Sequence, residues 1–267
     1  MPQTDGLVSI LMPAHDAQRT LRASMESVMA QSYAHWELIV INDASSDSTD
    51  AIAQDLAAQD PRIRVIFSGE GLGAAGARNL GLAQSTGRYV AFLDSDDLWH
   101  RDKLDRQLAF MQSHAIALSY CGYLRVSESG QLIETVTVPT QVSYTDLLRR
   151  NEIGCLTAIY DSTIFGKIPM PNLQRQHDYA LWLQLARTAG PVMGLNDPLA
   201  TYRVRRGSLS ANKRLAAIDM WAVFRHHEGL PWGRSLYYFA RYVVHSMTRR
   251  LIQRPQPAAP FVTDPLD

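Results

Sequence analysis

The sequence predicts an α/β fold built on a doubly wound, mostly parallel sheet. Over the first 115 residues, short apolar runs typical of strands alternate with helical patterns, and the connections between them are short. Two of the runs end abruptly in polar residues, as strands do where a parallel sheet presents a ligand site at its carboxyl edge. From residue 116 the pattern is less regular, which predicts a smaller mixed part followed by helices.

Residue patterns place the elements of this first part. Pro13 should end the first strand, because proline donates no hydrogen bond to a ladder. Ser48 or Thr49 should cap the helix after the second strand, since a hydroxyl can accept from a free backbone N–H. Glycines between 69 and 76 surround a turn into the third helix. Strands are expected at 7–12, 37–41, 63–67 and 89–93, and helices at 20–31, 49–59 and around 77–80.

The rest of the chain predicts a mixed part and a helical end. Gly190 and Pro191 should stop a helix that begins at His177. A turn at 128–130 should join two strands as a hairpin. Further strands are expected at 117–120, 123–126, 132–138 and 155–160. The expected limits are 1–115 and 116–229 for the two parts, 230–254 for a C-terminal helix, and 255–267 for a proline-rich, disordered tail.

Three carboxylates follow the fourth strand within four residues. Asp94, Asp96 and Asp97 lie where ligands of open α/β sheets bind, beyond the carboxyl ends of the strands. Crowded carboxylates repel one another unless a cation compensates, and hard oxygen ligands suit Mg²⁺ or Mn²⁺. The alternative is an aspartate-rich turn in which Asp97 caps the following helix. The cluster favours a site for a metal ion and a phosphate-bearing ligand.

Composition and charge limit the function classes. Lys plus Arg equals Asp plus Glu at 26 each, so whole-chain charge gives no argument for a nucleic-acid partner. The segment 203–254 nevertheless carries 11 basic and 2 acidic residues, so an acidic body is followed by a basic end. Cys121 and Cys155 are too few for a disulfide framework, which favours a reducing, cytoplasmic compartment. We expect neither a signal peptide nor a membrane-spanning segment.

Four segments occur in a fixed order: VSILMPAHD at 8–16, VINDASSD at 40–47, AAGARNLG at 74–81 and FLDSDDLW at 92–99. In this order they resemble the catalytic domain of glycosyltransferase family 2, which has the nucleotide-diphospho-sugar transferase (GT-A) fold. The stretches 176–183 and 198–203 resemble the acceptor region of that family. The resemblance is to bacterial enzymes that build cell-surface polysaccharides, teichuronic-acid-type transferases among them.

The resemblance implies an inverting glycosyltransferase. It would move a sugar from a nucleotide-diphosphate sugar, UDP-linked, to a growing lipid-linked cell-surface glycan, with Mg²⁺ or Mn²⁺ held by Asp94 and Asp96. It places Asp43 against the uracil ring, where a turn or helix cap is the alternative. For His15 and Arg78, a solvated surface position is the alternative. The nucleotide-binding residues that it implies are Pro13, Ala14, His15, Asp16, Asp43, Arg78, Asp94 and Ser95.

Asp178 is implied as the base that takes the acceptor's hydroxyl proton while the oxygen attacks the anomeric carbon. Its alternative is a carboxylate that only stabilises a helix N-terminus. Relatives often carry a charged residue just before this aspartate, whereas this chain has His177. Some relatives also have a metal-binding histidine near the position of Arg205 and Arg206. Arginine cannot ligate a cation, so Arg203, Arg205 and Arg206 would clamp the diphosphate or the acceptor, or form a solvated basic loop.

Two other function classes stay open on the sequence. A non-catalytic nucleotide-sugar-binding subunit of a polysaccharide assembly complex would have no need of a base at Asp178. A nucleotidyltransferase shares the sheet architecture, but it would normally carry a basic, glycine-rich phosphate loop near its N-terminus. The turn after the first strand reads PAHD instead.

The segment 230–254 has an amphipathic pattern. No proline or glycine interrupts 235–254, and at about 100° per residue one apolar face forms, with basic residues nearly opposite. Such a helix can lie in the interface of an anionic bilayer, which predicts peripheral attachment to the inner face of the cytoplasmic membrane. The alternative is packing on the catalytic domain or on a second copy, in a homodimer. The apolar face consists of Leu236, Ala240, Val243, Met247 and Leu251.

Overall fold

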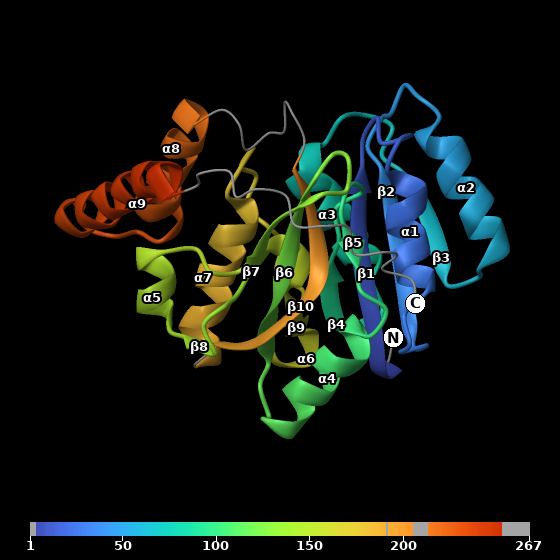
Figure 1. Ribbon diagram of the computed structural model, residues 1–267, viewed down its shortest axis with the longest axis horizontal. Coiled ribbons are helices and arrows are strands. Elements are labelled where there is room, and N and C mark those ends of the chain that lie inside the picture. The colour runs from blue at the N-terminus through green and yellow to red at the C-terminus, as the bar shows by residue number, and fades with distance from the viewer. Residues whose placement is uncertain (1–3, 191, 205–212, 253–267) are drawn as a thin grey trace.

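The computed structural model describes residues 4–190, 192–204 and 213–252, and within these a ten-stranded sheet forms the centre (Figure 1). Its order is β3-β2-β1-β4-β9-β6-β10-β5, with β7 paired to β6 and β8 to β10. The strands are β1 Thr4–Ala14, β2 Trp36–Asn42, β3 Ile63–Phe67, β4 Gly87–Phe92, β5 Leu98–Trp99, β6 Leu118–Ser127, β7 Leu132–Val136, β8 Gln141–Val142, β9 Ile159–Asp161 and β10 Val192–Val204.

Helices cover both faces of this sheet (Figure 1). The alternation of side chains along β1 and β2 explains why both are needed: Ile10 and Val40 enter one buried cluster, Leu11 and Ile41 the other. Helices α1, α2 and α4 cover the first cluster, and α3 and α7 the second. The helices are α1 Leu21–Met29, α2 Thr49–Gln59, α3 Gly73–Gln84, α4 Lys103–Ser113, α5 Tyr144–Arg149, α6 Ser162–Phe165, α7 His177–Ala189, α8 Lys213–Ala222 and α9 Trp232–Ile252.

The four strands of the first part pair in parallel, as predicted, in the order β3-β2-β1-β4. The mixed part joins the same sheet, because β9 pairs antiparallel with β4 and β6. The division at residue 115 stays a prediction, as do the other domain limits, and the expected tail at 255–267 lies outside the described residues. None of the described helices has the length and apolar character that crossing a bilayer requires.

Three local predictions were wrong. Pro13 does not end β1, which continues to Ala14; pairing with β4 stops at Leu11, so Pro13 has a strand neighbour on one side only, where proline is tolerated. Neither Ser48 nor Thr49 caps α2 with its side chain: the Asp47 carboxylate accepts the backbone N–H of Thr49 at 2.9 Å. The expected strand at 155–160 is a 3₁₀ turn, Cys155–Thr157, followed by the short β9.

Candidate active site

The aspartate cluster lies directly after β4. Asp97 is 1% exposed, and its carboxylate accepts the backbone N–H of Arg203, on β10, at 2.9 Å. Burial, together with the neighbouring Asp94 and Asp96, raises the pKa of Asp97 well above its usual range. The next helix, α4, begins at Lys103 after Asp102. The alternative in which Asp97 caps that helix is therefore wrong, since its side chain ties the aspartate turn to β10.

Arg203 also holds the aspartate turn through its side chain. Its Nε donates to the carbonyl of Asp96, and its Nη2 donates to Ser24 Oγ at 3.0 Å. Ser24 Oγ in turn donates to the carbonyl of Ser95 at 2.9 Å. The predicted role of Arg203 toward a diphosphate or acceptor stays a prediction, and Arg205 and Arg206 lie outside the described residues.

Arg78 is buried on α3, at 3% exposure, and is not a solvated helical arginine. Its Nη2 donates to the Asp94 carboxylate, and its Nη1 lies 2.7 Å from His177 Nε2. Burial lowers the pKa of Arg78, but nearby acidic groups, with Asp94 first among them, together outweigh burial and the pKa is raised. One permanently charged guanidinium therefore joins the aspartate turn after β4 to the first residue of α7.

The contacts of His177 fix its tautomer. Nδ1 lies 3.2 Å from the carbonyl of Leu173, which can only accept, so Nδ1 carries the hydrogen. Arg78 can only donate, so Nε2 is the acceptor and the ring is neutral. Burial and then the Arg78 charge lower the pKa of His177. His177, whose role is open from the sequence, thus joins Arg78 to the first turn of α7, directly before Asp178.

We expect His177 to make the protein sensitive to acid. Because its pKa is lower folded than unfolded, the unfolded chain binds a proton first, and stability is lost as pH falls below about 6.5. His177→Gln keeps both an acceptor and a donor, so its unfolding temperature should fall less between pH 8 and pH 5 than that of the wild type. His114→Gln, at the exposed end of α4, is the control. If the unfolding temperatures of wild type and His177→Gln fall by the same amount across this pH range, the assignment is contradicted.

The nucleoside residues predicted from the sequence gather at the ends of β1 and β2. Asp43 is 6% exposed, and its carboxylate accepts the backbone N–H of Leu72 at 2.7 Å and of Gly73 at 2.8 Å. It thus caps α3, rather than the helix that follows it in sequence. Its carbonyl lies 2.6 Å from His15 Nδ1, and Asp16 accepts the backbone N–H of Ser46 at 2.8 Å. A contact of Asp43 with uracil stays a prediction.

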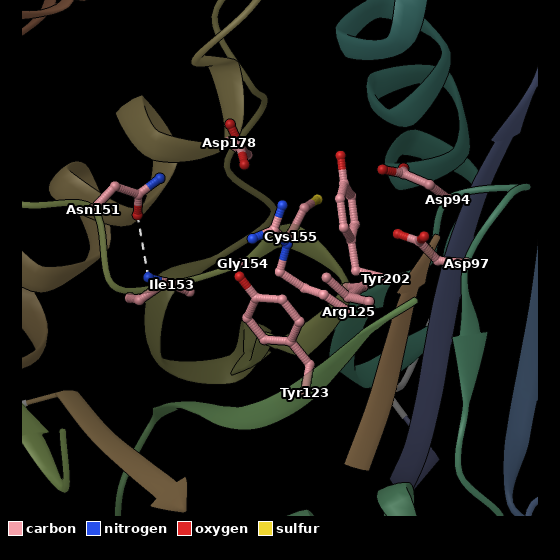
Figure 2. Close-up of a pocket in the computed structure, with 11 residues that line it drawn as sticks. Asp94, Asp97, Tyr123, Arg125, Asn151, Ile153, Gly154, Cys155, Asp178 and Tyr202 are labelled. Carbon is pink, nitrogen blue, oxygen red and sulfur yellow. Dashed lines mark hydrogen bonds between the residues drawn. The ribbon is translucent and has the colours of Figure 1, made fainter. Parts of the chain in front are cut away.

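A pocket of about 350 Å³ opens between the aspartate turn and α7. Figure 2 shows Asp178 on one side of it and Asp94 and Asp97 on the other, with Tyr202 between. Asp178 is half-buried in the first turn of α7. The lining consists of Asp94, Asp97, Tyr123, Arg125, Asn151, Ile153, Gly154, Cys155, Leu156, Asp178 and Tyr202.

The pocket brings together some predicted residues and omits others. Asp94 and Asp178 both line it, although they are 84 positions apart in the sequence. The residues at the ends of β1 and β2, from Pro13 to Asp16 and at Asp43, do not line it. The sequence reading missed Tyr123, Arg125, Asn151 and the segment 153–156. Only Tyr202 carried a signal, through its place in the stretch 198–203.

The residues present fit a divalent cation. Among the described residues, no three His, Cys, Asp or Glu side chains group to hold a metal ion by themselves. Mg²⁺ and Mn²⁺ sites in phosphate-transfer enzymes commonly use one or two carboxylates, and the substrate phosphates supply the rest. Asp94 and Asp96 lie on one turn with the buried Asp97, and two carboxylates fit the protein's share of that donor set; metal binding by them stays a prediction.

Comparisons with known proteins point to one family. The family model described as "Glycosyl transferase family 2" matches residues 9–166. A protein of Bacillus subtilis (strain 168) whose name assigns it to teichuronic acid biosynthesis, the glycosyltransferase TuaG, is 39% identical over 92% of this chain and 98% of its own length. The Escherichia coli UDP-Glc:alpha-D-GlcNAc-diphosphoundecaprenol beta-1,3-glucosyltransferase WfgD is 36% identical over 90% of this chain and 93% of its own.

Solved structures share the fold. TarS of S. aureus (residues 1–349), crystallised with UDP-GlcNAc, superposes with a TM-score of 0.72 at 20% identity, over 90% of this chain and 72% of that one. The Pyrobaculum calidifontis mannosyltransferase PcManGT, in complex with GDP-Man and Mn²⁺, gives a TM-score of 0.62 at 15% identity, over 92% and 80% of the two chains. These likenesses confirm the predicted doubly wound fold.

Proposed function

Because this chain belongs to glycosyltransferase family 2 and has the GT-A fold, we propose that it moves a sugar from a UDP-linked donor to a lipid-linked, cell-surface glycan. The observation that carries this proposal is that Asp94 and Asp178 line opposite sides of one pocket. Asp94 follows a central parallel strand, where nucleotides bind in α/β sheets. Asp178 stands opposite on α7, where a second substrate can approach the donor.

The reaction inverts the configuration at the anomeric carbon. An acceptor hydroxyl lies in the pocket within hydrogen-bond reach of Asp178, whose carboxylate takes the proton as the hydroxyl oxygen attacks. The new bond between this oxygen and the anomeric carbon forms as the bond to the diphosphate oxygen breaks on the opposite face. The nucleoside diphosphate leaves with the bonding electrons. Asp178 lies in the first turn of α7, where the helix dipole stabilises negative charge.

A divalent cation, Mg²⁺ or Mn²⁺, completes the donor side. Asp96 would be its main ligand from the chain, and Asp94 would support it or contact the ribose. When bound, the cation supplies positive charge against the diphosphate, which becomes more negative as the sugar leaves. Arg78 holds Asp94 in place for this task through its ion pair.

The donor and acceptor classes are supported by names of relatives. WfgD is named for a UDP-glucose donor and a diphosphoundecaprenol-linked acceptor, and TarS was crystallised with UDP-GlcNAc. On this basis we propose that this chain takes a UDP-sugar and meets a lipid diphosphate acceptor, which would place it at the inner face of the cytoplasmic membrane. A non-catalytic binding subunit is not favoured, because such a subunit would have no need of the Asp178 carboxylate that lines the pocket. Neither is a nucleotidyltransferase, given the family match.

A donor panel tests the proposed function. We expect release of UDP from one UDP-sugar only when Mn²⁺ and a GlcNAc-diphospho-lipid acceptor are both present. The measurement is nucleotide diphosphate release across UDP-, GDP- and dTDP-sugars, with and without acceptor. Tight binding of a UDP-sugar without acceptor-dependent release would favour the binding subunit instead.

A further inference from the structure

The C-terminal helix α9 has three distinct sides. One side packs on the body of the protein: Ser235 is fully buried, and Tyr238, Phe239 and Tyr242 contact the buried cluster that contains Phe224. A second side is apolar yet exposed. Its members are Trp232 at 69%, Leu236 at 61%, Tyr237 at 52% and Val244 at 59% exposure.

The exposed apolar side is broad. At about 100° per residue, these four side chains spread over an arc of about 140°, next to the arc that packs inward. The face expected from the sequence belongs to this exposed arc: Leu236 and Ala240 are exposed and Val243 is half-buried, while the side chains of Met247 and Leu251 lie outside the described residues. The alternative in which that face packs on the catalytic domain is therefore wrong for Leu236 and Ala240, because aromatic side chains on a neighbouring face take that place.

The exposed surface continues from α9 onto α8. The ring of Trp221, on α8, lies 5.5 Å from the ring of Trp232, and one turn earlier Ile218 is 62% exposed. Leu215, a further turn back, is 40% exposed. We name the surface formed by Leu215, Ile218, Trp232, Leu236, Tyr237 and Val244 the α8–α9 patch. Large apolar side chains that are exposed together on neighbouring helices often mark an interaction site.

The charge around the α8–α9 patch is basic. On the third side of α9, Arg234 and Arg241 are exposed beside the apolar arc. The sequence 213–252 contains seven Lys or Arg and only two acidic residues, Asp219 and Glu228. Glu228 is engaged elsewhere, because it pairs with Arg187 and accepts from Tyr144. A partner that suits this surface is therefore apolar at its centre and negatively charged at its edge.

We propose, resting on the lipid-linked acceptor of the proposed function, that the α8–α9 patch lies in the interface of an anionic bilayer and holds the pocket at the membrane surface. Such a bilayer offers acyl chains to the apolar arc, phosphates to the arginines, and a boundary where tryptophan and tyrosine are stable. A second copy of the chain would instead bring the two arginine borders together, which like charge disfavours.

The position of the α8–α9 patch relative to the pocket supports this assignment. Helix α9 contacts α5, and the chain directly after α5 supplies Asn151, Ile153 and Gly154 to the pocket wall. Figure 1 shows α8 and α9 together at one end of the molecule, beyond α7 and α5. Figure 2 shows Asn151 and Ile153 on the same side of the pocket as Asp178. The helix that carries most of the α8–α9 patch thus packs on the same side of the pocket as Asp178.

The test uses the full chain with two matched double variants. Leu236→Glu with Val244→Glu places charge in the α8–α9 patch at exposed positions that the fold does not bury. Ile164→Glu with Leu132→Glu makes the same change at exposed residues of α6 and β7, at 63% and 57% exposure. Co-sedimentation is measured with vesicles of phosphatidylcholine alone and with added phosphatidylglycerol, at low and high salt.

We expect wild type and the α6–β7 variant to pellet with anionic vesicles in a salt-sensitive manner, and the α8–α9 variant to bind at least tenfold more weakly. Equal pelleting of the two variants overturns the proposal. The proposal is also overturned if the wild type is a dimer, the α8–α9 variant is a monomer, and both bind vesicles equally. A second copy of the chain would then cover the α8–α9 patch.

Activity separates this proposal from the proposed function. With a short-chain, water-soluble diphosphate acceptor, all three proteins should have the same kcat/KM, and only the vesicle-embedded acceptor should distinguish the α8–α9 variant. If no acceptor supports transfer but vesicle binding follows the expected pattern, the membrane surface stands and the proposed function fails.

Discussion

Replacing Asp178 with asparagine should lower kcat for sugar transfer by about 10²–10⁴-fold, the usual contribution of a general base. The amide keeps the shape of the side chain but cannot accept the hydroxyl proton. The KM for the nucleotide sugar should change little, because Asp94, on the proposed donor side, lies across the pocket from Asp178 (Figure 2). Steady-state kinetics at saturating acceptor measure both quantities.

The matched control for this change is Asp105→Asn. Asp105 is an exposed carboxylate in the first turn of α4, as Asp178 is in the first turn of α7. Both substitutions remove a favourable helix-dipole interaction of about 0.3–1 kcal/mol, but only Asp178 lines the pocket. A comparable loss of kcat in both variants, or unchanged turnover in Asp178→Asn, would place the base elsewhere.

Replacing Asp96 with alanine should abolish measurable transfer while the protein stays folded. The loss should exceed the roughly 10²–10³-fold cost of removing one hydrogen-bond donor from a site of developing charge, because the substitution removes the main predicted ligand of the cation. Calorimetric titration with UDP should show that Mn²⁺ tightens nucleotide binding in the wild type and has no such effect in the variant.

The control for Asp96 is Asp55→Ala, a solvent-exposed carboxylate on α2 that pairs with Arg22. It should retain the response to Mn²⁺ and full transfer. Full activity of the wild type in excess chelator, or of Asp96→Ala with or without metal, would show that transfer proceeds without the predicted cation.

The elements that were predicted correctly depend on residues that lie close together in the sequence. Helix α7 spans the predicted residues 177–189, and Gly190 ends it with a positive φ of 73°, a conformation that glycine adopts readily. The strand β3 likewise has its predicted bounds, 63–67. In both cases the residues that decide the structure are neighbours in the chain.

The elements that were predicted wrongly depend on contacts between segments that are distant in the sequence. Pro13 stays in β1 because of which strands flank it, and that depends on the order of the sheet. The 3₁₀ turn at 155–157 is held by long-range contacts: Trp99 Nε1 donates to the carbonyl of Leu156 at 2.9 Å, and Gln107 Nε2 donates to that of Thr157 at 2.9 Å. No local pattern reports such partners.

The candidate site divides in the same way. The aspartates were predictable because they follow a strand end, and Asp178 because its surroundings resemble a known family. The far wall of the pocket was not predictable. Tyr123 and Arg125 reach it from the middle of β6, and Asn151 and Cys155 come from irregular chain. These residues meet only through the folding of segments distant in sequence.

The hydrogen-bonded chain from Asp94 through Arg78 to His177 has a thermodynamic consequence. Its two ends belong to the regions that we assign to different substrates. A nucleotide sugar that changes the interaction of Asp94 with Arg78 therefore also changes the contact of Arg78 with the first turn of α7. The affinities of donor and acceptor are then linked, and each must alter the other by the same factor. Measuring the dissociation constant of UDP with and without a bound acceptor analogue, in the wild type and in His177→Ala, should give a coupling that the variant loses. An equal coupling in both proteins would mean that communication between the two substrates follows another route.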